Sequence, residues 1–246
     1  MPDLIGFQWI WVIIAAALVG FSKMGLGGVS TIVIPLLASV FGGKESSAIM
    51  LPIALIGDLL AISYYRRNAD WKAIRRLLPW ALIGLIIGTI VGYLVDNSTF
   101  TFIIGITVLL CAIILIYIEV CGERFSVPQK LWFYVLMGIV GGFTTMIGNA
   151  AGPVMTVYLL AMGMKKNRFV GTYAWFFLIV NALKMPLQIL LWRSIGTQQI
   201  LLALSMIPAI VAGAILGTVV VKRIPEKPFR YVIIALTMVS AVRLFI

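Results

Sequence analysis

The chain has 246 residues, of which 62% are hydrophobic and only 11% are charged, and its mean hydropathy is +1.12. Soluble domains are usually about 45–50% apolar and about 25% charged, so this composition excludes an ordinary soluble protein. We therefore expect an all-α integral membrane protein that crosses the lipid bilayer several times, with helices packed through small residues such as its 23 glycines.

The formal net charge of +11 comes from 19 Lys and Arg against 8 Asp and Glu. Most of the basic residues fall in short loops between apolar segments, where they set membrane orientation, so a nucleic-acid partner is not expected. The chain has no histidine, and its two cysteines, Cys111 and Cys121, form no CxxC motif. Accordingly, neither a metal site, nor a cofactor, nor thiol–disulfide chemistry is expected.

Ten apolar segments follow one another along the chain. Five of them have roughly 20 residues or more and can cross about 30 Å of hydrocarbon as single helices, and the last segment is just long enough. The four shorter segments form two pairs, and each pair flanks a glycine-rich break. In chain order the segments are 5–21, 26–41, 46–65, 73–95, 99–119, 131–146, 151–162, 168–192, 198–221 and 229–246.

The distribution of Lys and Arg predicts the orientation of these segments. One side of the membrane receives fourteen of them, and the positive-inside rule makes that side cytoplasmic. The other side receives only Lys44, Arg193 and Arg243, which places both chain ends outside the cell membrane. The fourteen are Arg66, Arg67, Lys72, Arg75, Arg76, Arg124, Lys130, Lys165, Lys166, Arg168, Lys222, Arg223, Lys227 and Arg230.

With this orientation the chain divides into two inverted repeats, 1–122 and 123–246, within one membrane domain. Each repeat is predicted to contain a broken or re-entrant helical hairpin followed by three transmembrane helices. A shift of 122 residues also places Gly20-Phe21-Ser22 on Gly142-Phe143-Thr144 and Met24 on Met146. The sequence leaves open whether the hairpins cross the bilayer fully or dip in and return.

The first break contains Lys23, a cation in the middle of an apolar zone. A lysine at a helix break lies beside uncapped backbone N–H groups, and together they favour an anion. Ser22 adds a hydroxyl donor, and Gly25, Gly27 and Gly28 would let an oxyanion approach the backbone. The alternative is that Lys23 only extends from a hairpin tip toward the membrane surface.

The second break offers neutral donors at the mirrored position, without a second charge. Its candidate residues are Thr144, Thr145, Gly148 and Asn149. We expect them to complete the anion site from the opposite direction. The alternative is a glycine-rich helix contact, with Pro153 in the first turn of the next helix.

Three further polar residues lie deep in apolar segments. Asn181 and Lys184 are three positions apart and share one face of a helix, and ionisable residues within membrane segments usually face a cavity. Asp58 either carries a coupling proton or forms a structural ion pair with Lys23 or Lys184. Two lysines against one carboxylate leave one excess positive charge in the apolar zone, which favours an anionic cargo over a cationic one.

Two sets of residues stand in a distinctive order. The first half contains Gly20-Phe21-Ser22-Lys23-Met24-Gly25-Leu26-Gly27-Gly28, Pro35-Leu36-Leu37, Gly57-Asp58 and the Arg66/Arg67 loop; the second contains Gly141-Gly142-Phe143, Gly148-Asn149-Ala150-Ala151-Gly152-Pro153 and Asn181-Ala182-Leu183-Lys184. Both sets resemble the sulfite exporter TauE/SafE family, over nearly the whole chain. The resemblance implies a permease of the inner or plasma membrane that moves sulfite, sulfonates or related small sulfur anions. It also implies that Lys23 and Lys184 contact the anion and that Asp58 serves coupling.

The sequence therefore predicts a secondary transporter that works by alternating access and draws on a proton gradient or on the gradient of the anion itself. A passive anion channel, or a permease for a different small anion, is the alternative. An enzyme is the weakest hypothesis, because Asp58 is isolated and no histidine is present. The expected partners are a small anion and the lipid bilayer. The sequence leaves open a homodimer, the identity of the anion, the coupling ion and the direction of transport.

Overall fold

The computed structural model is all-helical throughout the part of the chain that it describes. The described residues are 6–24, 29, 33, 37, 41, 43–96, 99, 102, 106, 109–110, 113, 116–117, 120, 130–225, 227–229, 231–232 and 235. Gly25, Gly27 and Gly28 lie outside them, as do Cys111 and Cys121. Most of the predicted segments 26–41, 99–119 and 229–246 also lies outside, so those three predictions are not tested.

The described helices follow the predicted apolar segments closely. The first half contains α1 (Gly6–Lys23), α3 (Gly43–Tyr65), the short 3₁₀ helix η1 (Arg66–Asn68) and α4 (Trp71–Leu94). The second half contains α6 (Leu131–Gly148), α7 (Gly152–Ala161), α8 (Lys166–Leu190), α9 (Thr197–Ser205) and α10 (Ile207–Arg223). Four of them, α3, α4, α6 and α8, are long and apolar enough to cross a membrane, and α9 with α10 makes a fifth if the pair counts as one span. The chain is therefore a multi-pass membrane protein.

One predicted segment differs from the structure. We expected 198–221 to form a single helix, but it is divided at Met206 into α9 and α10, which are bent by 51°. Pro208 lies in the first turn of α10. Proline has no N–H to donate and its ring clashes with the carbonyl four residues earlier, which favours a bend at this position. The prolines inside α3, α4 and α8 do not divide those helices, so Pro208 favours the bend without being sufficient for it.

Two pairs of helices pack backbone to backbone through glycines. In the first pair, α1 lies along α10: Gly213 faces the carbonyl of Ala17, and Gly217 faces Phe21 and Met24. A side chain at either glycine would collide with the neighbouring helix. Close approach of this kind is how helices associate in lipid, where no hydrophobic effect drives them together.

The second pair, α4 with α6, repeats these contacts. Gly84 faces the carbonyl of Ile139, and Gly88 faces Phe143 and Met146. The three α6 residues in these contacts each lie 122 positions after an α1 residue of the first pair: Ile139 after Ala17, Phe143 after Phe21 and Met146 after Met24. In both pairs the later residue of one helix contacts the later residues of the other. The paired helices therefore run in the same direction.

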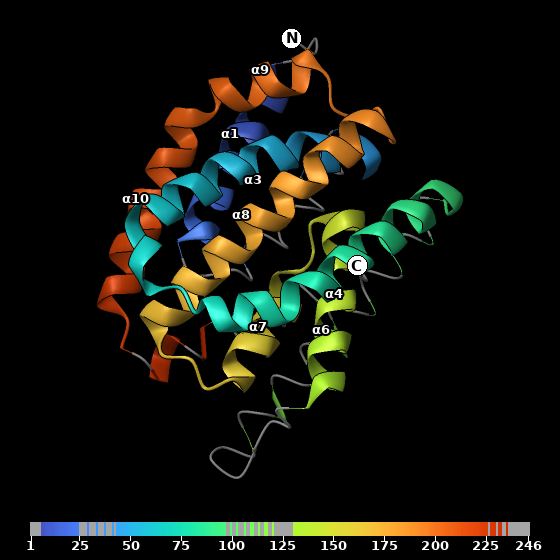
Figure 1. Cartoon of the computed structure of the whole chain (residues 1–246). Coiled ribbons are helices and arrows are strands. Elements are labelled where there is room, and N and C mark those ends of the chain that lie inside the picture. The colour runs from blue at the N-terminus through green and yellow to red at the C-terminus, as the bar shows by residue number, and fades with distance from the viewer. Residues whose placement is uncertain are drawn as a thin grey trace.

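Between the two pairs, α3 and α8 run side by side through the middle of the molecule in opposite directions (Figure 1). Ser47 lies opposite Gln188, Asp58 lies opposite Asn181, and Tyr65 lies beside Gly171. These two helices therefore connect the charged end, where α3 ends and α8 begins, with the opposite end of the molecule.

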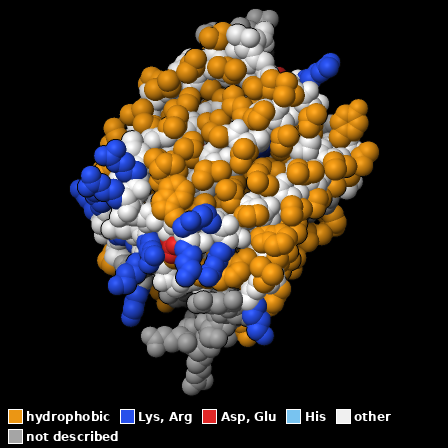
Figure 2. All heavy atoms as spheres, viewed as in Figure 1, with side chains coloured by type: hydrophobic (Ala, Val, Ile, Leu, Met, Phe, Trp, Pro, Cys, Tyr) orange, Lys and Arg blue, Asp and Glu red, His pale blue; other side chains and the backbone are white. Residues whose placement is uncertain are grey.

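The face seen in Figure 2 is mostly apolar and has one basic edge. Hydrophobic side chains cover most of this face, and Lys and Arg side chains gather at its lower left. That edge is the end where α3, η1, α4, α8 and α10 meet (Figure 1). Large apolar side chains on α4 and α10, including Ile86, Ile90, Ile215 and Leu216, are more than half exposed, as expected of residues that face lipid.

Candidate functional site

The second predicted break is present between α6 and α7. Helix α6 ends at Gly148, and Asn149 follows with φ 53° and ψ 25°, a left-handed conformation that asparagine tolerates better than most residues. The N–H of Asn149 donates to the Thr145 carbonyl and that of Ala150 donates to the Thr144 carbonyl. Helix α7 then begins at Gly152. The turn directs the Asn149 side chain toward α3 and α8.

Lys184 reaches this break from α8. Its side chain is fully buried, and its ammonium nitrogen Nζ donates to the Thr145 carbonyl and, at 2.7 Å, to Oδ1 of Asn149. Both acceptors are neutral, and no carboxylate of the described residues lies within ion-pair distance of Lys184. A buried cation without a counter-charge is costly and marks a functional site in a membrane segment.

Lys23 occupies a different environment at the end of α1. Its Nζ lies 2.8 Å from Oδ1 of Asp58, and both side chains are buried. Nζ also lies 4.7 Å from the centre of the Phe177 ring. Oδ2 of Asp58 accepts a hydrogen bond of 2.7 Å from Asn181. Lys23 and Asp58 therefore neutralise each other, and of the two partners left open for Asp58 the structure selects Lys23.

Gly57 provides the room that this ion pair needs. A methyl group at Gly57 would lie 3.0 Å from Cγ of Lys23, closer than an ordinary van der Waals contact. Ser22, which precedes Lys23 on α1, is buried as well. The end of α1 is thus packed tightly against the middle of α3.

The end of α1 and the break between α6 and α7 meet at a small cavity beside α3 and α8. The cavity has a volume of about 10 Å³, close to that of one water-sized probe. Four of the predicted site residues line it, together with Gly152 at the start of α7 and an apolar wall. The predicted four are Lys23, Thr145, Asn149 and Asn181, and the wall is Met50, Ala54, Tyr173 and Phe177.

The remaining predicted residues divide into two groups. Lys184 contacts the cavity only through Asn149 and Thr145, and Asp58 only through Lys23 and Asn181. Thr144 turns its hydroxyl back onto its own helix, donating to the Val140 carbonyl at 2.7 Å, and is not among the residues that line the cavity. Ser22 and Gly148 are also not among the lining residues.

Ser47 and Gln188 belong to the same polar cluster and were not predicted. Oγ of Ser47 accepts hydrogen bonds from Asn149 at 3.2 Å and from Gln188 at 3.3 Å. Gln188 lies four positions after Lys184, so it stands on the same face of α8. Helical spacing from Lys184 could have identified Gln188, whereas no signal in the sequence distinguished Ser47 from Ser46.

Toward the basic end, α8 carries a cluster of buried aromatic side chains. Tyr173 and Phe177 lie 4.5 Å apart between ring centres, Phe176 and Phe177 lie 5.4 Å apart, and all three are buried. This cluster lies between the central cavity and the basic end.

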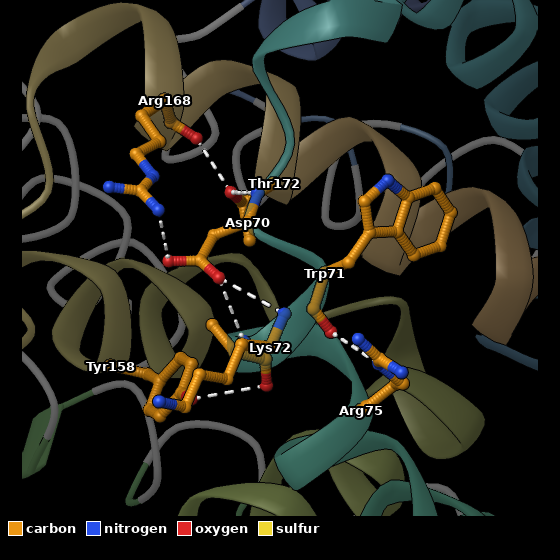
Figure 3. A network of polar contacts seen from close by, with 8 residues as sticks. Asp70, Trp71, Lys72, Arg75, Tyr158, Arg168 and Thr172 are labelled. Carbon is orange, nitrogen blue, oxygen red and sulfur yellow. Dashed lines mark hydrogen bonds and ion pairs between the residues drawn. The ribbon is translucent and has the colours of Figure 1, made fainter.

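A polar network ties the loops of the basic end together beyond the aromatic cluster (Figure 3). Asp70 caps α4 by accepting from the N–H groups of Lys72 and Ala73, and its other oxygen lies 3.0 Å from Nη2 of Arg168. The Asp70 N–H donates to the Thr172 hydroxyl at 2.8 Å. A cavity of about 780 Å³ opens beside these residues, but its lining residues come from η1, the neighbouring loops and the first turn of α8 and include none of the central cluster.

Comparisons with known proteins support one relationship. No curated protein and no solved structure matched the chain. The family model described as Sulfite exporter TauE/SafE matches residues 12–244, which is nearly the full length and includes both helix breaks. The resemblance found in the glycine-rich breaks is thereby confirmed, and the chain belongs to the sulfite exporter TauE/SafE family of membrane transporters.

Proposed function

We propose that this protein is a secondary transporter of small sulfur oxyanions, such as sulfite or an organosulfonate, across the cell membrane. The observation that carries the proposal is the environment of Lys184, a buried cation that only neutral oxygens contact. An anion in the adjoining cavity would supply the missing counter-charge. Membership of a sulfite exporter family makes a sulfur oxyanion the first cargo to test.

The site contains donors for such an anion from three helices and one break. Lys23, Asn149 and Asn181 line the cavity with N–H groups, and the first turn of α7, at Gly152, faces it as well. The N-terminal end of a helix carries partial positive charge and favours anions. Lys23 and the first turn of α7 are donors, and the amides of Asn149 and Asn181 each carry N–H groups that could turn to an oxyanion. The apolar wall of Met50, Ala54 and Phe177 restricts the size of the ligand.

The size of the cavity supports alternating access. A volume of about 10 Å³ holds roughly one water molecule, so a four-atom oxyanion fits only after the surrounding helices move apart. Among the described residues, the aromatic cluster and the Asp70–Arg168 network lie on the side of the cavity toward the basic end, and in this proposal they close that side. We assign the structure to an occluded state in which the site opens to neither side.

An inverted duplication would supply the two moving parts. Its main support is the repeated glycine packing, in which α1 with α10 and α4 with α6 make corresponding contacts. The opposed directions of α3 and α8 are also what two inverted halves require. In this proposal one half rocks against the other around the central cavity, with the termini outside.

The Lys23–Asp58 pair is suited to couple protons to the anion. The 2.8 Å contact occupies Lys23 while Asp58 is charged. A proton on Asp58 would remove the competing charge and free Lys23 to contact an anion in the cavity that it lines. One proton and one anion would then move together.

The test is uptake of radiolabelled sulfite by proteoliposomes that contain the purified protein. We expect saturable uptake that responds to an imposed pH gradient, and loss of uptake in Lys23→Ala. Arg193→Gln, which removes a positive charge outside the cluster, is the matched control and should behave like the wild type. Wild-type uptake no faster than that of empty liposomes would reject sulfite as the cargo.

The same measurement separates a carrier from a passive channel. Uptake that rises linearly with sulfite concentration and ignores the pH gradient would indicate a channel, and it would remove the coupling role of Asp58. Normal uptake by a folded Lys23→Ala protein would remove Lys23 from the site.

A further inference from the structure

Ser47 and Gln188 retain hydrogen-bonding capacity that no described residue uses. Both side chains are buried, and Gln188 is fully so. Oγ of Ser47 accepts two hydrogen bonds, from Asn149 and Gln188, and its own hydroxyl proton has no acceptor among the described residues. The amide oxygen of Gln188 has no donor there either. Buried polar atoms without partners are rare in folded proteins because each one is costly.

Turning the Gln188 amide over does not remove the surplus. In that orientation the Ser47 hydroxyl would donate to the amide oxygen, and the amide nitrogen would lose its acceptor. In either orientation an O–H or N–H donor therefore stays unused. It lies beside Asn149, which in turn accepts from the buried ammonium of Lys184.

The pair also has a definite place in the fold. Because α3 and α8 run in opposite directions, Ser47 and Gln188 lie farther from the basic end than Asp58 and Asn181 do. Polar side chains thus continue from the central cavity toward the end opposite the basic loops. In the other direction, toward the basic end, α8 carries the aromatic cluster at Tyr173 and Phe177.

We infer that Ser47 and Gln188, with Asn149 and Lys184, form a second oxyanion subsite on the far side of the central cavity from the basic end. The inference rests on the proposed function and extends it. An anion leaving the central cavity would take its next hydrogen bonds from these donors while Lys184 supplies the charge for both positions. The ligand is a small oxyanion, and sulfite is the probe.

The test combines Gln188→Met and Ser47→Ala with a control, Thr156→Val. Methionine keeps the length of glutamine and has no amide. Thr156, on α7, has a buried hydroxyl oxygen without a partner among the described residues, and no hydrogen bond within that part of the chain joins it to the cluster. Two quantities are measured for each full-length variant in detergent: the thermal unfolding temperature without ligand, and the sulfite concentration that gives half of the maximal stabilisation.

We expect Gln188→Met to unfold at the wild-type temperature or above it, because an unpaired polar group is removed, and to need roughly tenfold to a hundredfold more sulfite. Ser47→Ala should weaken sulfite binding in the same direction, and Thr156→Val should leave it unchanged. Lower stability with unchanged sulfite affinity in Gln188→Met would show that the pair is structural or holds a trapped water. That result would overturn this inference and leave the proposed function standing. Absence of any stabilisation of the wild type by sulfite, sulfate, thiosulfate or sulfoacetate would overturn both the inference and the proposed function.

Discussion

The two lysines of the membrane interior face opposite electrostatic conditions. Lys23 is paired with Asp58 at 2.8 Å and lies over the Phe177 ring, so that its charge is balanced within the protein. Among the described residues, Lys184 donates hydrogen bonds to the Thr145 carbonyl and the Asn149 amide oxygen and lies within ion-pair distance of no carboxylate. Both are buried in apolar segments, but only Lys184 leaves a charge for a ligand to balance.

This difference assigns the two lysines different tasks. A balanced pair can change its interactions when a proton arrives on the carboxylate, whereas an unbalanced cation gives the site its preference for anions in every state. Removing one member of a buried ion pair leaves the other charge stranded, and removing an unpaired cation strands none. Stability and binding should therefore respond differently at the two positions.

The largest effect on stability is expected from breaking the ion pair. Lys23→Met or Asp58→Asn alone should lower the free energy of unfolding by about 3–5 kcal/mol, because a buried charge loses its partner. The double variant Lys23→Met/Asp58→Asn should recover most of the loss. Thermal unfolding of the four proteins in detergent measures this, and a double variant as unstable as the sum of the singles would contradict the pairing.

A smaller effect on stability is expected from Lys184→Met. The variant loses two hydrogen bonds and leaves Asn149 and Thr145 oxygens without this donor, which should lower the free energy of unfolding by about 1–3 kcal/mol. No charge is stranded, so the loss should be smaller than in Lys23→Met. The same unfolding experiment decides this, and an equal or greater loss would mean that Lys184 has a counter-charge.

The turn that presents Asn149 to Lys184 can be tested by two replacements. Asn149→Gly removes the side-chain amide, but glycine adopts a φ of 53° without strain. Asn149→Ala removes the amide and also strains the backbone, which should lower the free energy of unfolding by about 1–2 kcal/mol more. Both should weaken sulfite binding similarly, since both lose the side chain. Equal stability of the two variants would show that residue 149 does not have a left-handed backbone conformation in the folded protein.

The smallest effect is expected at Gly57. A methyl group there would lie 3.0 Å from Cγ of Lys23 and would shift that side chain by a few tenths of an ångström. Gly57→Ala should therefore reduce stability by about 1 kcal/mol or less and alter the pH-gradient dependence of uptake before it alters sulfite affinity. If uptake by Gly57→Ala depended on the pH gradient as it does in the wild type, the exact position of the Lys23 side chain would have no role in proton coupling.

Much of this arrangement was accessible from the sequence. Apolar length and glycine-rich interruptions predicted α3, α4, α8 and the break between α6 and α7, because these features depend on local chain chemistry. The charge count predicted one basic end, which the structure shows at η1 and at the start of α8. The glycine contacts at Gly84 and Gly213 involve residues 122 positions apart, but the duplication itself stays a prediction.

The choice of partners was not accessible. Spacing places Asp58, Lys23 and Lys184 in the apolar zone, but only the packing of α1 against α3 determines that Asp58 pairs with Lys23. The bend at Met206 was missed because hydropathy continues through it, although Pro208 was a local signal. Ser47 acquires its role only through contact with residues about 100 and 140 positions away.

The excess charge on Lys184 is tested most directly by comparing sulfite binding to Lys184→Met and to Lys23→Met/Asp58→Asn. The first variant has no net charge among these three positions, and the second keeps one positive charge, as the wild type does. We expect Lys184→Met to bind sulfite roughly a hundredfold more weakly than the wild type, and the double variant to stay within about tenfold. Wild-type affinity in Lys184→Met, with binding lost in a stable double variant, would contradict the account.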